Sequence, residues 1–457
     1  MKCKHSVKLR ISLLLLTLAV SFSFLAACSG EGTQNPSRTG SYTISTPAPG
    51  TPDTEAQELT YTDITLLSAG DIMYHMTQLN SAYNSDTGTY DFSQNFKYVK
   101  NMISAADYAV VNFETTLSNQ DEYSAFPNFN SPLSVLDSIK DAGFDMLLFA
   151  NNHCYDFKKQ GFLATLGRFQ EYGFEYIGAK TDASEKSYMV KDIKGVKLGL
   201  LNYTDTITQP NGQYNTINGI TINDGCEELM DIYVRGKEEA LYAEVSERIA
   251  ELKANGAELI ILYIHWGDEY KLEPIDGQKT VAQQLCELGV DVIIGSHPHV
   301  VEPMEILTSQ SDPSHSTICF YSLGNYISNQ NRLSFSDLDY DIRPYTENGL
   351  MVTLTIRKYS TGDVYVKSID YTPTWVHRYP DGSGYQYNVV PLPQATSDPA
   401  SYGLTESDFG VDHAAAALQM TDPVFSAPVL AFNTKMADEI AAFSQAYYDN
   451  LKAATAG

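Results

Sequence analysis

Short apolar runs alternate with amphipathic stretches through the middle of the chain. Runs such as Ile64–Gly70 and Glu258–Ile264 have the length of buried strands, whereas apolar residues recur at helical spacing over Leu241–Leu252. This alternation predicts an α/β fold. The predicted strands are Ile64–Gly70, Tyr108–Glu114, Asp145–Ala150, Glu258–Ile264, Val290–Ile294 and Thr317–Tyr321, and the predicted helices are 96–106, 133–142, 241–252, 281–288 and 436–451.

Polar side chains follow these strands at the point where each apolar run ends. Ligand sites of α/β sheets gather outside the carboxyl ends of strands, and burying such side chains without partners costs free energy. We therefore expect them to converge on one site. The residues concerned are Asp71, Asn112, Glu114, Asn152, His153, His265, His297, His299 and Asn325.

Imidazole nitrogens and carboxylate oxygens dominate this set, which favours a divalent transition metal such as Mn, Fe or Zn. The His297-Pro298-His299 step is the part that packing explains least well. One or two bound ions would activate water and hold a tetrahedral oxyanion. His153 would then be placed to protonate a leaving group.

Taken singly, most of these motifs also have a structural interpretation. Asp71 fits a turn or a helix cap, and the stretch Asn112–Glu114 fits a satisfied network at a strand end. Asn151–His153 fits a polar turn, and His265–Gly267 fits packing plus a turn, with a core tryptophan. Three other histidines, His75, His315 and His377, are assigned to structure or surface.

The N-terminus has the pattern of a secretory signal. A basic start precedes an apolar stretch that ends at Leu25-Ala26-Ala27-Cys28, the pattern of a bacterial lipobox. We expect residues 1–27 to be a lipoprotein signal peptide, Cys28 to be lipidated, and 28–59 to be a flexible tether. A plain N-terminal anchor, or ordinary cleavage beside an incidental cysteine, is the alternative.

Charge and cysteine content narrow the range of partners. The chain has 30 Lys and Arg against 56 Asp and Glu, a formal net charge of −26, which argues against nucleic-acid binding through a basic face. An anionic substrate would have to be held locally, by a metal or a small cationic pocket. Cysteines 154, 226, 286 and 319 contain no CxxC pair, and the sequence leaves their pairing open.

The part after residue 375 differs in composition. Residues 376–410 are rich in Pro, Gly and Tyr and are predicted to be loop-like, and 412–455 contain Ala-rich helical stretches. This C-terminal loop and helical extension, 376–457, is interpreted as a cap on the sheet or a contact surface for a partner.

Six ordered motifs resemble the CapA family of poly-γ-glutamate capsule biosynthesis proteins, over a domain placed at 60–375. The motifs are Ser68–Asp71, Val111–Glu114, Ala150–His153 with Asp156, His265–Gly267 with Glu269 and Tyr270, Gly295–His299 and Tyr321–Tyr326. That family is similar to the calcineurin-like metallophosphoesterases, so the resemblance implies a β-sandwich flanked by helices with a metal site at the strand ends.

The resemblance also implies roles for individual residues. The metal-ligand candidates are Asp71, Glu114, Asn152, His265, His297 and His299, the catalytic candidates are His153 and Asp156, and the substrate-binding candidates are Asn112, Glu269 and Asn325. The chain departs from the metallophosphoesterase pattern in two places. Asp71 is followed by Ile72 and Met73 instead of the usual Asp-x-His, and Glu114 stands where Asp is usual, so one bound ion and two both stay open.

The function expected from these patterns is that of an outward-facing lipoprotein in capsule or surface-polymer biosynthesis, acting as a metal-dependent hydrolase on a phosphoester or amide. The rival hypothesis is a non-catalytic subunit that binds or guides an exported anionic polymer beside membrane synthase subunits. A third hypothesis is a surface enzyme acting on an unrelated phosphorylated metabolite.

Overall fold

The computed structural model describes residues 39–41, 58–119, 122–209, 215–334, 338–382 and 384–456. All of them belong to one compact unit, Thr39–Gly457. The predicted signal peptide and Cys28 lie outside the described residues, as does most of the predicted tether. No helix among the described residues combines the length and the apolar character that crossing a bilayer requires.

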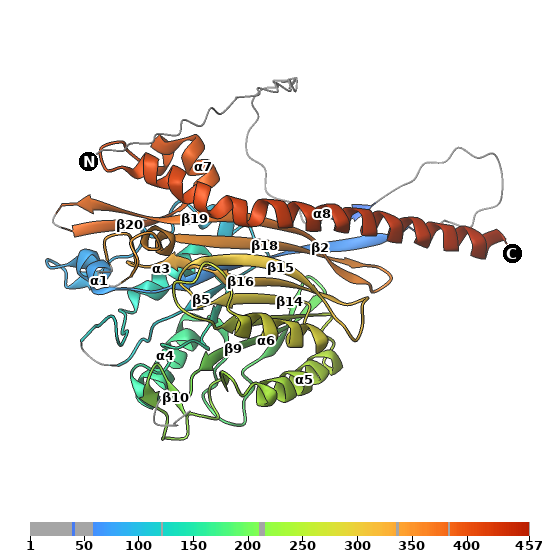
Figure 1. Cartoon of the computed structure of the whole chain (residues 1–457), viewed down its shortest axis with the longest axis horizontal. Coiled ribbons are helices and arrows are strands. Elements are labelled where there is room, and N and C mark those ends of the chain that lie inside the picture. Colours follow the sequence, from blue (N-terminus) through green and yellow to red (C-terminus); the bar gives the residue numbers. More distant parts are fainter. Residues whose placement is uncertain are drawn as a thin grey trace, which may run out of the picture. The chain divides into compact units, whose positions relative to one another are not determined.

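Two mixed sheets form the centre of this unit (Figure 1). The first has the order β20-β19-β18-β2-β5-β6-β7, with β1 and β17 also paired to β2, and the second has the order β12-β9-β13-β14-β16-β15, with β8 paired to β9. The strands of the first sheet are β1 (Thr39–Ser41), β2 (Thr60–Ile72), β5 (Tyr108–Phe113), β6 (Met146–Leu148), β7 (Glu175–Ile177), β17 (Asn325–Ile327), β18 (Asn348–Tyr359), β19 (Val364–Asp381) and β20 (Gly384–Pro391). Those of the second sheet are β8 (Met189–Ile193), β9 (Val196–Thr206), β12 (Ile232–Val234), β13 (Leu259–His265), β14 (Val292–Ser296), β15 (Val301–Thr308) and β16 (Ser316–Leu323).

Alternation along the strands builds a layered core. In β13, Ile261 and Tyr263 point into a cluster shared with the first sheet, whereas Ile260 and Leu262 point toward the helices on the other side. The two sheets therefore pack face to face and carry helices on their outer faces. These helices are α3 (Ser134–Ala142) and α4 (Lys158–Tyr172) on the first sheet, and α5 (Glu239–Ala254) and α6 (Asp276–Glu287) on the second.

The shorter elements connect or flank these layers. They are α1 (Met76–Ala82), α2 (Lys100–Ile103), the hairpins β3 (Tyr83–Asn84) with β4 (Thr89–Tyr90) and β10 (Thr216–Ile217) with β11 (Ile220–Thr221), η1 (Arg343–Glu347), α7 (Leu392–Ser397) and η2 (Pro399–Tyr402). The predicted helix 96–106 is therefore mostly wrong. Phe96, Val99 and Ile103 are buried with helical spacing, but Phe96–Val99 forms turns and only α2 is helical.

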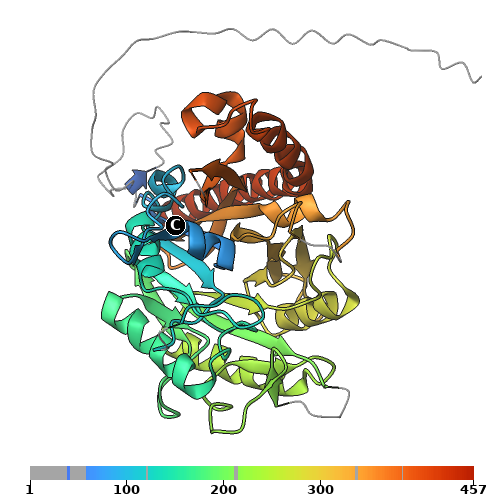
Figure 2. The same ribbon diagram turned by 90° about the vertical axis from the view of Figure 1, so that its left-hand side faces the viewer.

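The C-terminal part confirms one prediction and corrects another. A single helix, α8 (Gly410–Ala456), lies along β19, and its Phe425, Val429 and Phe432 join the core between the sheets (Figures 1 and 2). The predicted loop over 376–410 is wrong, because its first part completes β19 and forms β20, paired antiparallel in the first sheet. The expected boundary at 375 therefore falls inside a strand. The mixed α/β fold with a C-terminal helix is confirmed.

Candidate metal centre

Parallel pairing brings the predicted strand-end motifs to one place. Strands β2, β5 and β6 run parallel in the first sheet, and β9, β13 and β14 run parallel in the second. Carboxyl ends of parallel strands share an edge, so the segments that follow them meet there. β17 adds to this edge by pairing Asn325 with Asp71. The convergence expected from the sequence is present.

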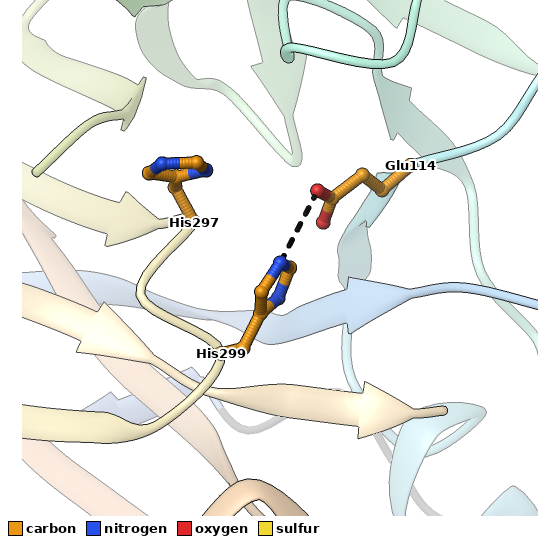
Figure 3. Close-up of side chains that lie close together, drawn as sticks. All are labelled: Glu114, His297 and His299. Carbon is orange, nitrogen blue, oxygen red and sulfur yellow. Dashed lines mark ion pairs between the residues drawn. The ribbon is translucent and has the colours of Figure 1, made fainter. Parts of the chain in front are cut away.

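Glu114 lies at the centre of this edge. Its Oε1 is 3.5 Å from Nε2 of His265. The same Oε1 is 3.8 Å from Nε2 of His299 (Figure 3). Glu114 is fully buried, and among the described residues neither of its oxygens has a hydrogen-bond partner. A buried carboxylate without donors is costly, so this position is suited to a cation.

Two groups of potential ligands share Glu114. One consists of Glu114, His297 and His299, and the other of Asp71, Glu114 and His265, with the ligand atoms of each group within 4.8 Å of one another. Asp71 also lies close to the first group, because its Oδ2 is 3.4 Å from Nδ1 of His299. The arrangement therefore offers nitrogen and oxygen donors on two sides of one carboxylate.

Hydrogen bonds from neighbouring residues orient these side chains. The five side chains of the two groups, Asp71, Glu114, His265, His297 and His299, are called the ligand cluster, or simply the cluster. The Ser296 hydroxyl is 3.0 Å from Nδ1 of His265, so the Nε2 side of this ring faces the rest of the cluster. Nε2 lies 3.0 Å from Oδ1 of Asn152. Nδ1 of His297 lies 3.1 Å from the same Nε2. Such second partners fix the orientation and tautomer of ligating histidines. The sequence motif contained Ser296, but its role was not predicted.

The backbone of the His297-Pro298-His299 turn is itself unusual. His297 has φ 99° and His299 has φ 56°, a region that costs a non-glycine residue about 1–2 kcal/mol. Just before them, a Cβ on Gly295 would lie 1.9 Å from the carbonyl oxygen of Tyr321, so only glycine fits. Strained backbone of this kind clusters at functional sites.

Burial decides the protonation of the cluster. It raises the pKa of Glu114 well above its usual value, and the nearby Asp71 carboxylate adds to this effect. Burial, followed by neighbouring imidazoles, lowers the pKa of His265 and His297 well below the usual value. For His299 burial acts in the same direction, but the nearby Asp71 and Glu269 carboxylates together outweigh it, and the pKa is raised. Two of the three imidazoles are thus held in the neutral form that binds metals.

A second pair lies beside the cluster. Nδ1 of His153 is 2.8 Å from Oδ2 of Asp156, and both side chains are buried. The backbone N–H of Phe129 donates to the same Oδ2 at 2.7 Å, and the Phe129 ring contacts the His153 ring edge-on at 4.7 Å. The two catalytic candidates therefore form a fixed pair.

A pocket of about 540 Å³ opens next to the ligand cluster and the His153–Asp156 pair. Its lining residues are Met73, His75, Phe126, His153, Glu269, Tyr270, His299, Asn329, Gln330, Ser334 and Leu338. Glu269, a predicted substrate contact, is among them. His75 was assigned to structure or surface, but it lies in this wall, where burial and the His299 ring lower its pKa to about 3. Only its position four residues after Asp71 could have suggested this.

The other predicted substrate contacts lie behind the cluster. Asn112 donates from Nδ2 to Oδ1 of Asp71 at 2.8 Å. Asn325 donates from Nδ2 to the carbonyl oxygens of His299 at 3.3 Å and Thr346 at 2.9 Å. Neither residue lines the pocket, and each holds a neighbouring residue of the cluster in place. Substrate contact by Asn112 and Asn325 stays a prediction.

The fold and this edge together define an α/β protein with a candidate metal centre at its strand ends. The family model described as bacterial capsule synthesis protein PGA_cap matches residues 65–330, more than half of the chain. The chain therefore belongs to this family, and the resemblance to CapA proteins is confirmed.

Two curated relatives carry matching names. The "PGA biosynthesis protein CapA" of Bacillus subtilis (strain 168) is 28% identical over 280 residues, 60% of this chain and 64% of the relative. The "Capsule biosynthesis protein CapA" of Bacillus anthracis is 27% identical over 276 residues, 58% of this chain and 60% of the relative. The chain thus matches less than two thirds of either relative's length.

A solved structure, of a hypothetical protein from Thermus thermophilus, is more distant. It is 12% identical, with a TM-score of 0.37, and the match covers 68% of this chain and 98% of that one. A likeness at this level supports no argument about fold or function.

Proposed function

We propose that this protein is a metal-dependent hydrolase of the metallophosphoesterase-like type that acts in capsule or surface-polymer biosynthesis. The observation that carries the proposal is Glu114, a fully buried carboxylate whose two oxygens lack hydrogen-bond partners among the described residues while imidazoles of His265 and His299 lie within 4 Å. A catalytic centre for a divalent ion accounts for that arrangement better than packing does.

The donor set fits such an ion. Glu114, His297 and His299 would hold one ion, and Asp71, Glu114 and His265 a second, with Asn152 as a further oxygen donor. Mn, Fe and Zn all accept mixed imidazole and carboxylate donors. A bound divalent ion would supply a water of lowered pKa and would polarise the bond to be cleaved.

The chain's own residues supply the rest of the chemistry. Because Nδ1 of His153 faces the Asp156 carboxylate, its Nε2 is free to hold the proton that a leaving group needs. Asp156 keeps the ring in that orientation and stabilises its charged form. The adjacent pocket, lined by Tyr270, Gln330 and Glu269, would bind the part of the substrate beyond the cleaved bond.

The biological setting is proposed from the relatives and the N-terminal pattern. The two Bacillus relatives are named for capsule or PGA biosynthesis. The Leu25–Cys28 pattern supports anchoring through lipidated Cys28 and an extracytoplasmic location. A bound divalent ion would also allow a chain of net charge −26 to hold an anionic polymer or a phosphoester.

Metal content tests the proposal. The full chain is purified, loaded with Mn²⁺ or Zn²⁺, desalted and measured by mass spectrometry beside a His297→Ala/His299→Ala variant. One or two equivalents that the variant loses would support the centre. His377→Ala is the matched control, because His377 is also buried but lies outside both ligand groups. Equal metal content in all three proteins would refute it.

The rival function is a non-catalytic subunit that guides an anionic polymer beside a membrane synthase. The missing histidine after Asp71-Ile72 favours it, since a weakened metal site suits a binder better than an enzyme. His153→Ala separates the two functions. A hydrolase loses about 100-fold or more in turnover with its general acid, whereas a binder retains its polymer affinity and complements a deletion strain.

A further inference from the structure

A short hairpin reaches the His153–Asp156 pair from a distant part of the chain. It consists of β10 and β11, joined by Asn218 and Gly219. Asn218 has φ 46° and Gly219 has φ 74°, the two positive values of a type I′ turn, for which Asn-Gly is the preferred sequence. The hairpin therefore forms from local sequence, and its tip presents the Asn218 side chain.

The Asn218 amide contacts the buried pair directly. Its Nδ2 donates to Oδ1 of Asp156 at 3.1 Å and to the carbonyl oxygen of Pro127 at 3.2 Å, and it lies 3.3 Å from Nδ1 of His153. Asn218 itself is exposed, whereas His153 is 3% and Asp156 6% exposed. An exposed side chain thus covers an otherwise enclosed pair.

These contacts complete the hydrogen bonding of Asp156. Its Oδ2 accepts from the Phe129 N–H and faces Nδ1 of His153, while its Oδ1 accepts from Asn218. With Nδ2 of Asn218 able only to donate, the carboxylate is the acceptor for the Nδ1 proton of His153. The Asp156 carboxylate thereby selects the tautomer in which Nε2 lacks a proton until the ring is charged, and Asn218 acts on this choice through its hydrogen bond to the carboxylate.

The base of the hairpin is held independently of its tip. Ile217 and Ile222 are buried in the main core cluster, and Nδ2 of Asn215 donates to the carbonyl oxygen of Ile222 at 2.9 Å. The Thr206 hydroxyl donates to the carbonyl oxygen of Thr216 at 2.5 Å. Removing the Asn218 side chain therefore leaves the hairpin anchored.

We propose that Asn218 is a positioning residue for proton donation by His153, acting through Asp156. This inference rests on the proposed hydrolase function. Asn218 holds the Asp156 carboxylate in the plane that the His153 ring requires, so that the proton on Nε2 of the charged ring passes to the leaving atom as its bond to the substrate breaks. Asn218 would thus act on the pair without itself lining the pocket.

Two substitutions isolate the amide. Asn218→Gly removes the side chain and keeps a residue that adopts positive φ without strain. Asn218→Asp keeps the shape but places a carboxylate against Asp156. Asn215→Ala is the matched control, because it removes the same kind of amide from the base of the hairpin without touching the pair. The buried Ile217 and Ile222 and the Thr206 hydroxyl still anchor the hairpin in this variant.

The measured quantity is how kcat depends on the leaving group of the substrate. Hydrolysis of p-nitrophenyl phosphate and phenyl phosphate by the Mn²⁺-loaded full chain is compared, because nitrophenolate departs without protonation and phenolate needs it. For Asn218→Gly we expect kcat to fall about 10-fold on phenyl phosphate, the effect of one hydrogen bond to a charged group, and to change little on p-nitrophenyl phosphate. Asn218→Asp should fall further, and Asn215→Ala should match the wild type.

Equal losses on both esters, or none on either, would overturn the proposal. If the wild type cleaves neither ester, phosphoester hydrolysis has failed as its activity, and ¹⁵N NMR of the imidazoles still tests the inference. The wild-type His153 signal, assigned with His153→Gln, should show the Nδ1-protonated tautomer, and Asn218→Gly should show a mixture. An unchanged tautomer in Asn218→Gly would refute the positioning role.

Discussion

Replacing Glu114 by glutamine separates the cost of the buried carboxylate from its use as a ligand. Without metal, Glu114 lacks hydrogen-bond partners among the described residues and its pKa is raised well above the usual value by burial. The folded state then binds more protons than the unfolded state above pH 4.5, so this group lowers stability as pH rises. Glu114→Gln should remove that decline and leave the metal-free protein at least as stable at pH 8.

When metal is bound, Glu114 stabilises the folded state instead of destabilising it. An ion present at 100 times its dissociation constant stabilises the folded state by about 2.7 kcal/mol. A unit of roughly 400 residues unfolds with an entropy of about 0.8 kcal/mol/K, so the melting temperature should rise by about 3 °C. Glu114→Gln should lose that rise, because the amide is a poor ligand and both donor groups share this position.

Differential scanning calorimetry measures the melting temperature of the wild type and of Glu114→Gln between pH 5 and 8. Each protein is measured once with EDTA and once with Zn²⁺. Glu302→Gln is the matched control, since burial raises the pKa of Glu302 to about 8 but its nearest partner is Gln278 and not the cluster. It should share the pH effect and keep the full response to metal. A Zn²⁺-induced rise that survives in Glu114→Gln would refute the reasoning.

Three further predictions concern stability and reactivity away from the cluster. Trp266→Phe should cost about 1–3 kcal/mol in urea unfolding, because the indole N–H donates at 3.0 Å to the buried carbonyl oxygen of Tyr321; a loss under about 0.5 kcal/mol would count against that bond. Arg248→Ala should cost about 3–5 kcal/mol, because it leaves the buried Asp231 carboxylate without its bidentate partner, and Asp231→Asn in the same background should recover part of the loss. Cys154 should not react with a thiol reagent at pH 8 until the protein unfolds, since it is free and fully buried and burial raises its pKa to about 12; rapid labelling of the native protein would contradict this.

The sequence predicts most of the site because its signals are local. Each strand that carries a ligand candidate is a short apolar run followed by a polar residue, and parallel pairing alone brings such ends together. In the His265–Gly267 stretch, Trp266 is a core residue, as the structural interpretation expects, and His265 lies beside Glu114, while its role as a metal ligand stays a prediction. His75 and Asn218 were missed because their roles depend on long-range contacts with Asn329 and Asp156.

The C-terminal strands were missed for a different reason. β19 includes Pro373 and Pro380, and residues of this kind predict loops when neighbouring strands are unknown. Its pairing with β18 on one side and β20 on the other, and its packing against α8, outweigh that local preference. Strand formation here is decided by tertiary contacts, which periodicity in a single sequence does not reveal.

The central claim is that the strand ends around Glu114 form a metal centre, and anomalous diffraction tests it most directly. Crystals grown with Mn²⁺ or Zn²⁺ are measured above and below the absorption edge of the metal. The account predicts an anomalous peak at about 2.0–2.2 Å from a Glu114 oxygen and from a nitrogen of His265, His297 or His299. Peaks confined to surface carboxylates at saturating metal, with none beside Glu114, would contradict it.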